Sequence, residues 1–151
     1  MRHNGRSSPR GECRMRRLSI LLFALFVALG AGCASDVRNQ ALITTLNAYA
    51  NTLRWGDFQS ALQFVDPKVA AEHPLSALDL QRFQQVRVTG YDEGAGAVPD
   101  GENRVRQVVQ ISLVNLNTQS ERTVIDRQSW RYDPQTKHWW LTSGLPDITH
   151  N

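Results

Sequence analysis

Asp126 is the first candidate for chemistry, because it is the one acidic residue in the strand predicted from Arg122 to Tyr132. Gln128 follows it at an interval of two, so both side chains share one face of that strand. A carboxylate placed beside apolar residues under helices would have a raised pKa and could act as a general base. In the alternative, a slip of one residue turns Asp126 outward, where it pairs with Arg104 or Arg127.

The Asn-Thr-Gln-Ser turn between the two long strands predicts which residues face each other. With this turn setting the register, Leu113 lies opposite Val124. The shared face then carries both apolar and polar side chains: Val109, Ile111, Asp126, Gln128 and Trp130. On this face Gln107 and Gln128 could orient a ligand, and Tyr49 could reach it from the first predicted helix.

The tryptophans of the last predicted hairpin give a second candidate, a surface for a partner. A tight turn in this hairpin would put Trp130 opposite Trp139, where a cross-strand aromatic pair adds about 0.5–1.5 kcal/mol beyond burial. Trp140 then points to the other face, near Arg127 and Arg131. An exposed Trp beside Arg suits a protein or glycan contact. The alternative is cation–π packing on the sheet.

The other reactive residue types form no recognisable site. His73, His138 and His150 are scattered and lack metal-ligand spacing. No serine stands in a G-x-S-x-G elbow, and no glycine-rich phosphate loop precedes a helix. The two cysteines, Cys13 and Cys33, both precede the expected domain. The sequence therefore predicts no metal, no cofactor, no disulfide and no thiol nucleophile.

The domain is expected to begin with helices, which pack against the strands that carry these side chains. Apolar residues at spacings of four, three and four predict an amphipathic helix from Gln40 to Arg54: Leu42, Leu46, Tyr49 and Leu53. The Gly-Asp pair that follows suits a left-handed helix end and the next N-cap. Short helices are expected over 58–65 and after the Asp66-Pro67 pair, and a brief capped turn over Ser76 to Asp79.

After Leu80 the apolar period changes from 3.6 to 2, which predicts four antiparallel strands joined by short connections. The expected strands are residues 83–91, a long strand with Val105, Val109, Ile111 and Leu113 on one face, residues 122–132 and residues 138–143. A Gly-rich loop covers Asp92 to Asn103, and Leu145 to Ile148 is expected to pack onto the fold as a terminal lock. Helices followed by such a meander predict an α+β fold, with N-terminal helices on a curved, cone-like sheet.

Two segments resemble the nuclear transport factor 2-like (cystatin-like) superfamily. They are Ala48 to Leu62, with its helix–Gly–Asp–helix opening, and the hairpin from Trp130 to Leu141. The resemblance implies a curved sheet around a cone-shaped pocket, as in ketosteroid isomerases, polyketide cyclases and dehydratases, which typically place Asp or His inside. Many relatives in that superfamily have no activity and serve as binding or assembly modules, so the fold does not select a function.

The N-terminal 33 residues resemble the signal peptide of a bacterial lipoprotein. A basic head from Met15 to Arg17 precedes an apolar run from Ile20 to Ala28. This run is too short to cross a bilayer, which needs about 20 residues. Gly-Ala-Gly then precedes Cys33, as in a lipobox, although Leu29 stands one position too far upstream. The resemblance implies acylation of Cys33, and the alternative is ordinary cleavage to a soluble periplasmic protein.

Removal of this leader would change the charge of the protein. Residues 1–32 hold six of the 17 basic and one of the 14 acidic residues, so the net charge falls from +3 to about −2. This excludes nucleic-acid binding driven by net positive charge. The expected organisation is a signal peptide over 1–32 (Met15 being the suspected start), lipidated Cys33 and a tether to residue 40, one domain over 41–146 and a tail over 147–151.

The sequence therefore predicts a membrane-anchored cell-envelope lipoprotein whose domain binds or scaffolds a partner. That partner is an envelope protein or a second copy in a sheet-to-sheet homodimer. Ala34, after the cysteine, implies the periplasmic face of the outer membrane by resemblance to enteric lipoproteins. The alternative is a small pocket enzyme of the isomerase, cyclase or dehydratase class with Asp126 as general base. An exposed Asp126 on the outer sheet face would exclude that enzyme.

Overall fold

The computed structural model describes residues 35–148. The expectations for the signal peptide, Cys33 and His150 lie outside these residues. The chain divides into two compact units, Met1–Asn39 and Gln40–Asn151. Of the first unit, residues 35–39 are described, and they are helical. The hydrophobic core and the sheet belong to the second unit.

The N-terminal helix covers residues 35–54 of the described chain, so it includes residues 35–39, which the sequence pattern placed in a tether. Residues 35–39 contain no glycine or proline and can continue a helix. The buried face is the predicted one: Tyr49, Ala50 and Leu53 are buried, and Leu42 and Leu46 pack against the core. Gly56, at φ 75°, ends the helix in the left-handed conformation.

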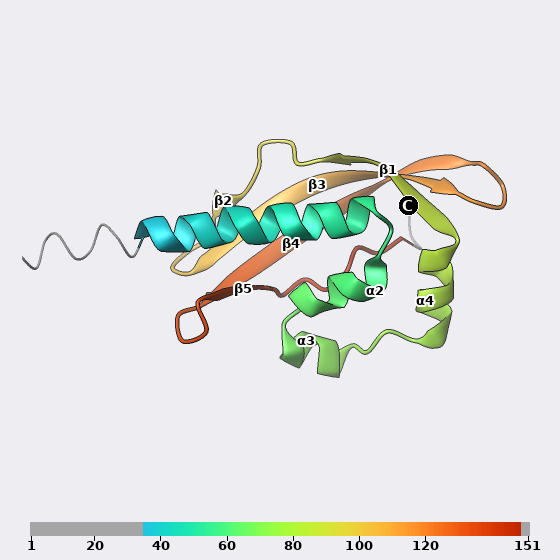
Figure 1. Cartoon of the computed structure of the whole chain (residues 1–151). Coiled ribbons are helices and arrows are strands. Elements are labelled where there is room, and N and C mark those ends of the chain that lie inside the picture. The colour runs from blue at the N-terminus through green and yellow to red at the C-terminus, as the bar shows by residue number, and fades with distance from the viewer. Residues whose placement is uncertain (1–34, 149–151) are drawn as a thin grey trace, which may run out of the picture. The chain divides into compact units, whose positions relative to one another are not determined.

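Three short helices and one 3-10 turn follow (Figure 1): α2 (Phe58–Ala61), η1 (Leu62–Phe64), α3 (Pro67–Glu72) and α4 (Ala77–Gln84). The predicted caps are confirmed. The Asp57 carboxylate accepts a hydrogen bond from the Ser60 backbone N–H at 2.8 Å, and the Asp66 carboxylate accepts one from the Lys68 backbone N–H at 3.0 Å. Both bonds satisfy amide groups that have no partner within their helix.

Helix α4 is longer than the predicted turn, and it contains Phe83, which the alternating pattern placed in a strand. Ser76 and Asp79 form a capping box, in which each side chain accepts a hydrogen bond from the other residue's backbone N–H. The Phe83 ring stacks on Phe58 with a centroid distance of 4.3 Å. The prediction that Phe83 lies in a strand is wrong, because α4 continues to Gln84. The stacking of Phe83 on Phe58 stabilises this last turn of the helix.

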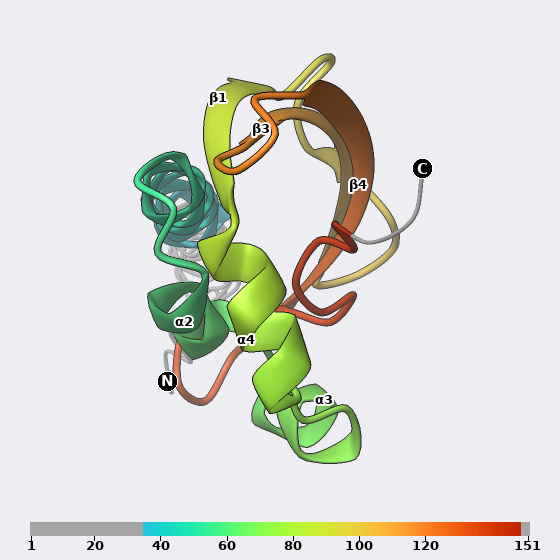
Figure 2. The same ribbon diagram turned by 90° about the vertical axis from the view of Figure 1, so that its right-hand side faces the viewer.

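The sheet has the order β1-β3-β4-β5 and is antiparallel throughout. Its strands are β1 (Val86–Asp92), β2 (Val98–Pro99), β3 (Arg104–Asn115), β4 (Glu121–Asp133) and β5 (His138–Leu141). The short β2 lies in the predicted loop and pairs with β3 beyond the end of β1. The predicted α+β class is confirmed, and Figure 2 shows the sheet curled into a half-barrel around its inner face.

Strand β1 contains a bulge that changes which side chains face inward. Its register with β3 shifts between Val88 and Gly90, and Tyr91 lies opposite the buried Ile111. A Cβ atom on Gly90 would lie 3.2 Å from the Ser112 side chain, so glycine permits this close approach. Bulges of this kind bend a strand and increase its twist.

Both predicted hairpin registers are wrong by two residues. Leu113 pairs with Arg122 rather than Val124, and Trp139 pairs with Tyr132 rather than Trp130. Gln119 and Lys137 adopt left-handed conformations within the two connections, at φ 57° and 55°, and each turn is centred one residue away from its predicted centre. A shift of two residues keeps each side chain on the same face of the sheet, so the inner and outer faces of these strands were predicted correctly.

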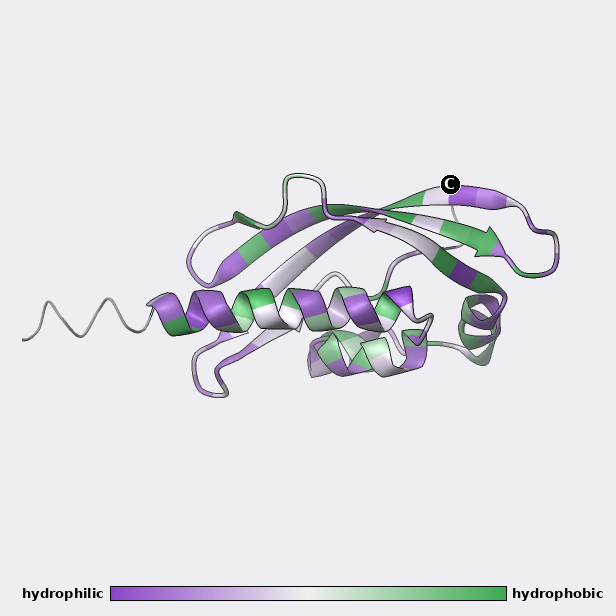
Figure 3. Cartoon of the chain, turned by 45° about the horizontal axis from the view of Figure 1, so that its top comes forward, coloured by the Kyte–Doolittle hydropathy of each residue, from purple (hydrophilic) through white to green (hydrophobic). Residues whose placement is uncertain are grey.

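The core fills the inside of the curl. Figure 3 shows hydrophobic and hydrophilic residues alternating along the strands, as expected for a sheet with one buried face. The C-terminal segment also contributes, because Ile148 is buried in the core and its carbonyl oxygen accepts a hydrogen bond from the Arg122 guanidinium. The predicted terminal lock is confirmed, and packed structure extends into the segment expected to be a tail.

Candidate functional site

The curled sheet and the N-terminal helix bring the predicted polar residues together. Asp126 and Gln128 lie on the inner face of β4, Gln107 lies opposite Gln128 on β3, and Tyr49 comes from the helix. Their exposed fractions are 7%, 1%, 3% and 0%, respectively. We call these four residues, together with Tyr91 of β1, the inner polar cluster.

Asp126 does not point outward. Arg104 and Arg127, its alternative partners, are exposed residues, whereas Asp126 is buried opposite Val109. The prediction that Asp126 shares a face with Val109 and Ile111 is therefore confirmed. The strand pairs without a bulge between Arg104 and Val114 of β3, so nothing interrupts the alternation of faces along this part of β4.

Gln128 is the centre of the hydrogen bonds in the cluster. Its amide nitrogen Nε2 donates to Asp126 Oδ2 at 2.8 Å and to the Tyr91 hydroxyl at 3.0 Å. Its oxygen Oε1 accepts a hydrogen bond from Trp130 Nε1 at 3.2 Å. One glutamine side chain thus fixes a carboxyl group, a phenol and an indole on the inner face.

Burial raises the pKa of Asp126 from its ordinary 3.8 to about 6, and the hydrogen bond from Gln128 opposes part of this rise. Burial also raises the pKa of Tyr49 well above its ordinary value, and the nearby Asp126 charge adds to the rise. The pKa of Tyr91 is raised mainly by burial as well. Near neutral pH the cluster therefore contains two neutral phenols and one carboxyl group that can take up a proton.

Two buried polar atoms of the cluster have no hydrogen-bond partner among the described residues: the Tyr49 hydroxyl and Gln107 Oε1. The Tyr49 ring packs edge-on against Trp130 and Phe64, with centroid distances of 5.3 and 5.6 Å. A buried polar group without a partner costs about 1–3 kcal/mol. These two atoms could therefore form hydrogen bonds with a polar atom of a bound molecule.

The predicted partner surface is only partly assembled. Trp140 is half-buried, lies opposite Arg131 across the β4–β5 pair and packs against His138 at a centroid distance of 4.2 Å. The Arg131 guanidinium donates to Asp66 at 2.6 Å and thereby ties β4 to the cap of α3. Arg127 lies four residues before Arg131 in β4 and is exposed.

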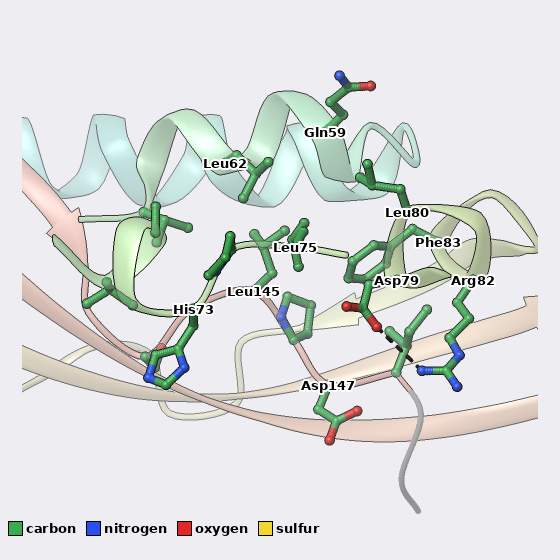
Figure 4. Close-up of a pocket in the computed structure, with 18 residues that line it drawn as sticks. Gln59, Leu62, His73, Leu75, Asp79, Leu80, Arg82, Phe83, Leu145 and Asp147 are labelled. Carbon is green, nitrogen blue, oxygen red and sulfur yellow. Dashed lines mark hydrogen bonds and ion pairs between the residues drawn. The ribbon is translucent and has the colours of Figure 1, made fainter. Parts of the chain in front are cut away.

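A cleft that the sequence did not predict lies among η1, α3, α4 and the C-terminal segment 143–148 (Figure 4). Its volume is about 750 Å³. We call it the apolar cleft, because its wall consists mainly of aliphatic and aromatic side chains, including Leu62, Val65, Val69, Leu75, Phe83 and Leu145. Polar side chains also line it, among them His73, Asp147 and the Arg82–Asp79 ion pair at 3.4 Å.

Tyr91 and the apolar cleft are the features that sequence reasoning missed. Alternation from Val86 and Val88 places Tyr91 on the outer face, and the bulge at Gly90 reverses this. The apolar residues Leu75 and Leu145 gave a weak signal, since both interrupt otherwise polar connections. Nothing in the linear pattern indicates that these two connections meet.

Within residues 35–148, no group of three or more His, Cys, Asp or Glu side chains is arranged to hold a metal ion. His73 lines the apolar cleft and His138 packs on Trp140. In the same part of the chain, no helix combines the length and apolar character needed to cross a bilayer.

The fold and the cluster define a class of domain: an N-terminal helix packed against a curled antiparallel half-barrel, with polar groups enclosed on the inner face. No protein-family model, no curated protein and no solved structure matches this chain.

Proposed function

We propose that the chain is a membrane-anchored cell-envelope lipoprotein whose domain binds a small, largely apolar molecule in the apolar cleft. The volume and lining of this cleft carry the proposal. Ligand sites are typically concave, mostly apolar and about 300–1,000 Å³ in volume, and the apolar cleft, at about 750 Å³, falls within this range.

The anchor is proposed from the sequence around Cys33. A diacylglycerol thioether and an N-acyl chain would supply three acyl chains, and each buried CH₂ group contributes about 0.8 kcal/mol to membrane binding. By resemblance, Ala34 supports the periplasmic face of the outer membrane, and the helix-and-sheet order supports the nuclear transport factor 2-like superfamily. Such an anchor would hold the binding domain at a membrane surface.

Fluorescence titration of the full chain with anilinonaphthalene sulfonate tests the binding site. Leu75→Asp puts a charge into the apolar wall and should weaken dye binding about tenfold or more, because a buried charge without a partner is strongly unfavourable. Leu78→Asp is the matched control, since Leu78 is 54% exposed on α4 and does not line the cleft. Equal dye affinity in both variants would show that the dye binds elsewhere.

The intact mass of the native protein tests the anchor. We expect a chain that begins at Cys33 and carries the mass of the acyl groups, and a Cys33→Ser variant that lacks this mass. An unmodified cysteine in protein taken from native membranes would reject the anchor and leave the cleft untouched.

A second candidate, a small enzyme that moves a proton next to a carbonyl group, is favoured by the position of Asp126. Its carboxyl group is buried beside Gln128, and its pKa of about 6 suits a general base near neutral pH. The Tyr49 hydroxyl and Gln107 Oε1 could bond a polar substrate. The apolar cleft does not include Asp126, so the two candidates use different parts of the domain.

Deuterium incorporation tests this second candidate. The full chain is incubated in heavy water with a panel of cyclic ketones, and exchange at the carbon next to the carbonyl is followed by NMR. Exchange that the chain accelerates and Asp126→Asn abolishes would support the enzyme. The same exchange rate with the chain and with Asp126→Asn would reject it.

A further inference from the structure

Strand β4 has one edge that is paired along only part of its length. Strand β5 pairs with β4 from Trp130 to Asp133. The next residues of the chain bond to β4 at two places: the Ser129 carbonyl oxygen accepts from the Thr142 backbone N–H at 2.7 Å and the Ser129 N–H donates to Ser143 Oγ at 3.3 Å, and further on the Arg122 guanidinium donates to the Ile148 carbonyl oxygen. Within residues 35–148, no strand pairs with this edge between Glu121 and Gln128.

The direction of the backbone groups follows from Ser129. In an antiparallel strand, the N–H and C=O groups of one residue point to the same side, and successive residues alternate. The backbone N–H and C=O groups of Ser129 point away from β3. The backbone groups of every second residue before it therefore also point away from β3: Arg127, Ile125, Thr123 and Glu121. Among the described residues, no hydrogen bond reaches the backbone of these four on that side.

This free edge also lacks some of the features that usually prevent strand addition. Proteins protect edges with charged side chains, lysine above all, and with proline, bulges or a covering segment; here the charged residues stand at the two ends of the edge, Glu121 and Arg122 at one and Asp126 and Arg127 at the other. The stretch from Glu121 to Arg127 contains no proline, lysine or bulge, and its centre is Thr-Val-Ile, three residues that favour strands. Ile125 is 44% exposed on the outer face. An edge of this kind is suited to receive another strand.

The charges at the two ends of the free edge identify the occupant. The free edge begins at Glu121, the first residue of β4. It ends at Arg127, the last residue with unpaired backbone groups before Ser129, which bonds to Thr142. The midpoint of the free edge is Val124. An antiparallel copy of the same strand, related by a two-fold axis at Val124, puts Glu121 of each copy opposite Arg127 of the other. Thr123 then lies opposite Ile125, and on the inner face Arg122 lies opposite Asp126.

We propose that two copies of this chain pair β4 to β4 around Val124 and form one continuous sheet. This register uses every free backbone group of the edge and gives two opposite-charge pairs on the outer face. Moving the register by two residues leaves part of the edge unpaired and separates Glu121 from Arg127. The pairing is edge to edge, which differs from the sheet-to-sheet dimer considered from the sequence, and it does not depend on the proposed ligand or anchor.

A charge exchange tests the register in the full chain, kept in mild detergent because of its apolar run from Ile20 to Ala28. The dimer dissociation constant is measured by analytical ultracentrifugation. Glu121→Arg or Arg127→Glu alone should raise this constant about tenfold, because each change turns two attractive cross-strand pairs into two repulsive ones. The double exchange should restore the original value, and Arg87→Glu on β1 is the matched control.

Hydrogen exchange gives a second measurement that needs no substitution. The backbone N–H groups of Thr123, Ile125 and Arg127 should exchange slowly at concentrations where the dimer forms and rapidly after dilution. A chain that stays monomeric overturns the proposal. So does a dimer that Glu121→Arg leaves unchanged or the double exchange does not restore, because then a different surface, register or partner occupies the edge.

Discussion

The inner polar cluster and the apolar cleft are built in opposite ways. The cluster lies on two long strands, a bulged strand and a long helix, and every side chain of it except Tyr91 is at most 7% exposed. The cleft lies among short helices, a connection and the C-terminal segment, and its wall residues Leu62, Leu75 and Leu145 are only partly buried.

This difference separates two kinds of site. In the cluster, the hydrogen bonds of Gln128 hold each polar group in one geometry, and desolvation keeps the Asp126 pKa high. In the cleft, apolar side chains on short elements can adjust to the shape of a ligand. We therefore expect the cluster to dominate stability and proton uptake, and the cleft to dominate ligand binding.

Loss of Trp130 should have the largest effect on stability. Trp130→Ala removes a side chain that is 1% exposed, and such changes cost about 3–5 kcal/mol of unfolding free energy. Trp55→Ala is the matched control, because Trp55 is 88% exposed, and its effect should be within about 0.5 kcal/mol. Urea denaturation measures both. Similar losses in the two variants would contradict the assignment of the core to the inner face.

The charge of Asp126 should make stability depend on pH. Between its ordinary pKa of 3.8 and its folded pKa of about 6, the folded protein keeps a proton that the unfolded chain releases. Stability therefore falls as pH rises through this window, by about 3 kcal/mol in total. Asp126→Asn should remove this fall, so that above about pH 6 the variant is the more stable protein.

Urea denaturation across this pH range measures the dependence. Glu102→Gln, at an exposed position on the connection before β3, is the control and should keep the slope of the unchanged protein. A wild-type stability that rises between pH values of about 4 and 6, with the same slope in Asp126→Asn, would show that Asp126 is ionised at little cost.

Removal of the central glutamine should have a smaller effect. Gln128→Leu leaves the Trp130 indole N–H without its acceptor and Asp126 and Tyr91 without their donor. We expect a loss of about 2 kcal/mol, and a further rise in the Asp126 pKa, because this hydrogen bond lowers it. Denaturation and carboxyl NMR titration measure the two effects. Gln110→Leu, on the outer face of β3, should change neither.

The smallest change in stability is expected in the cleft. Leu75→Ala removes a partly buried side chain from its wall, and the loss should be about 1 kcal/mol. Leu78→Ala, at an exposed position, should cost less than about 0.5 kcal/mol. A loss at Leu75 as large as at Trp130 would remove the distinction between a rigid cluster and an adaptable cleft.

The predicted cluster shows why faces are easier to predict than partners. Side chains alternate along a strand, so Asp126, Gln128 and Trp130 could be placed on the inner face even with a register wrong by two residues. The hydrogen bonds of Gln128 could not be predicted, because Tyr91 comes from another strand. Its orientation depends on the bulge at Gly90, which arises where β1 and β3 pack together.

The helical part shows the same division. The caps Asp57, Asp66 and Ser76 depend on atoms within three residues of each other, so the sequence alone predicted them. Phe83 was misplaced because its partner, Phe58, lies 25 residues earlier in the chain. Helix caps and hydrophobic periods depend on neighbouring residues, so they do not predict a contact between residues so far apart in the chain.

By itself the sequence determined the α+β class, the buried face of the first helix, the caps and the inner face of the long strands, because these follow from local bonding and from periods of 3.6 and 2. Only the tertiary structure decided the bulge, the hydrogen bonds of the inner polar cluster, the apolar cleft and the free edge of β4. Each of these depends on where distant segments meet, and that position results from packing the whole core at once.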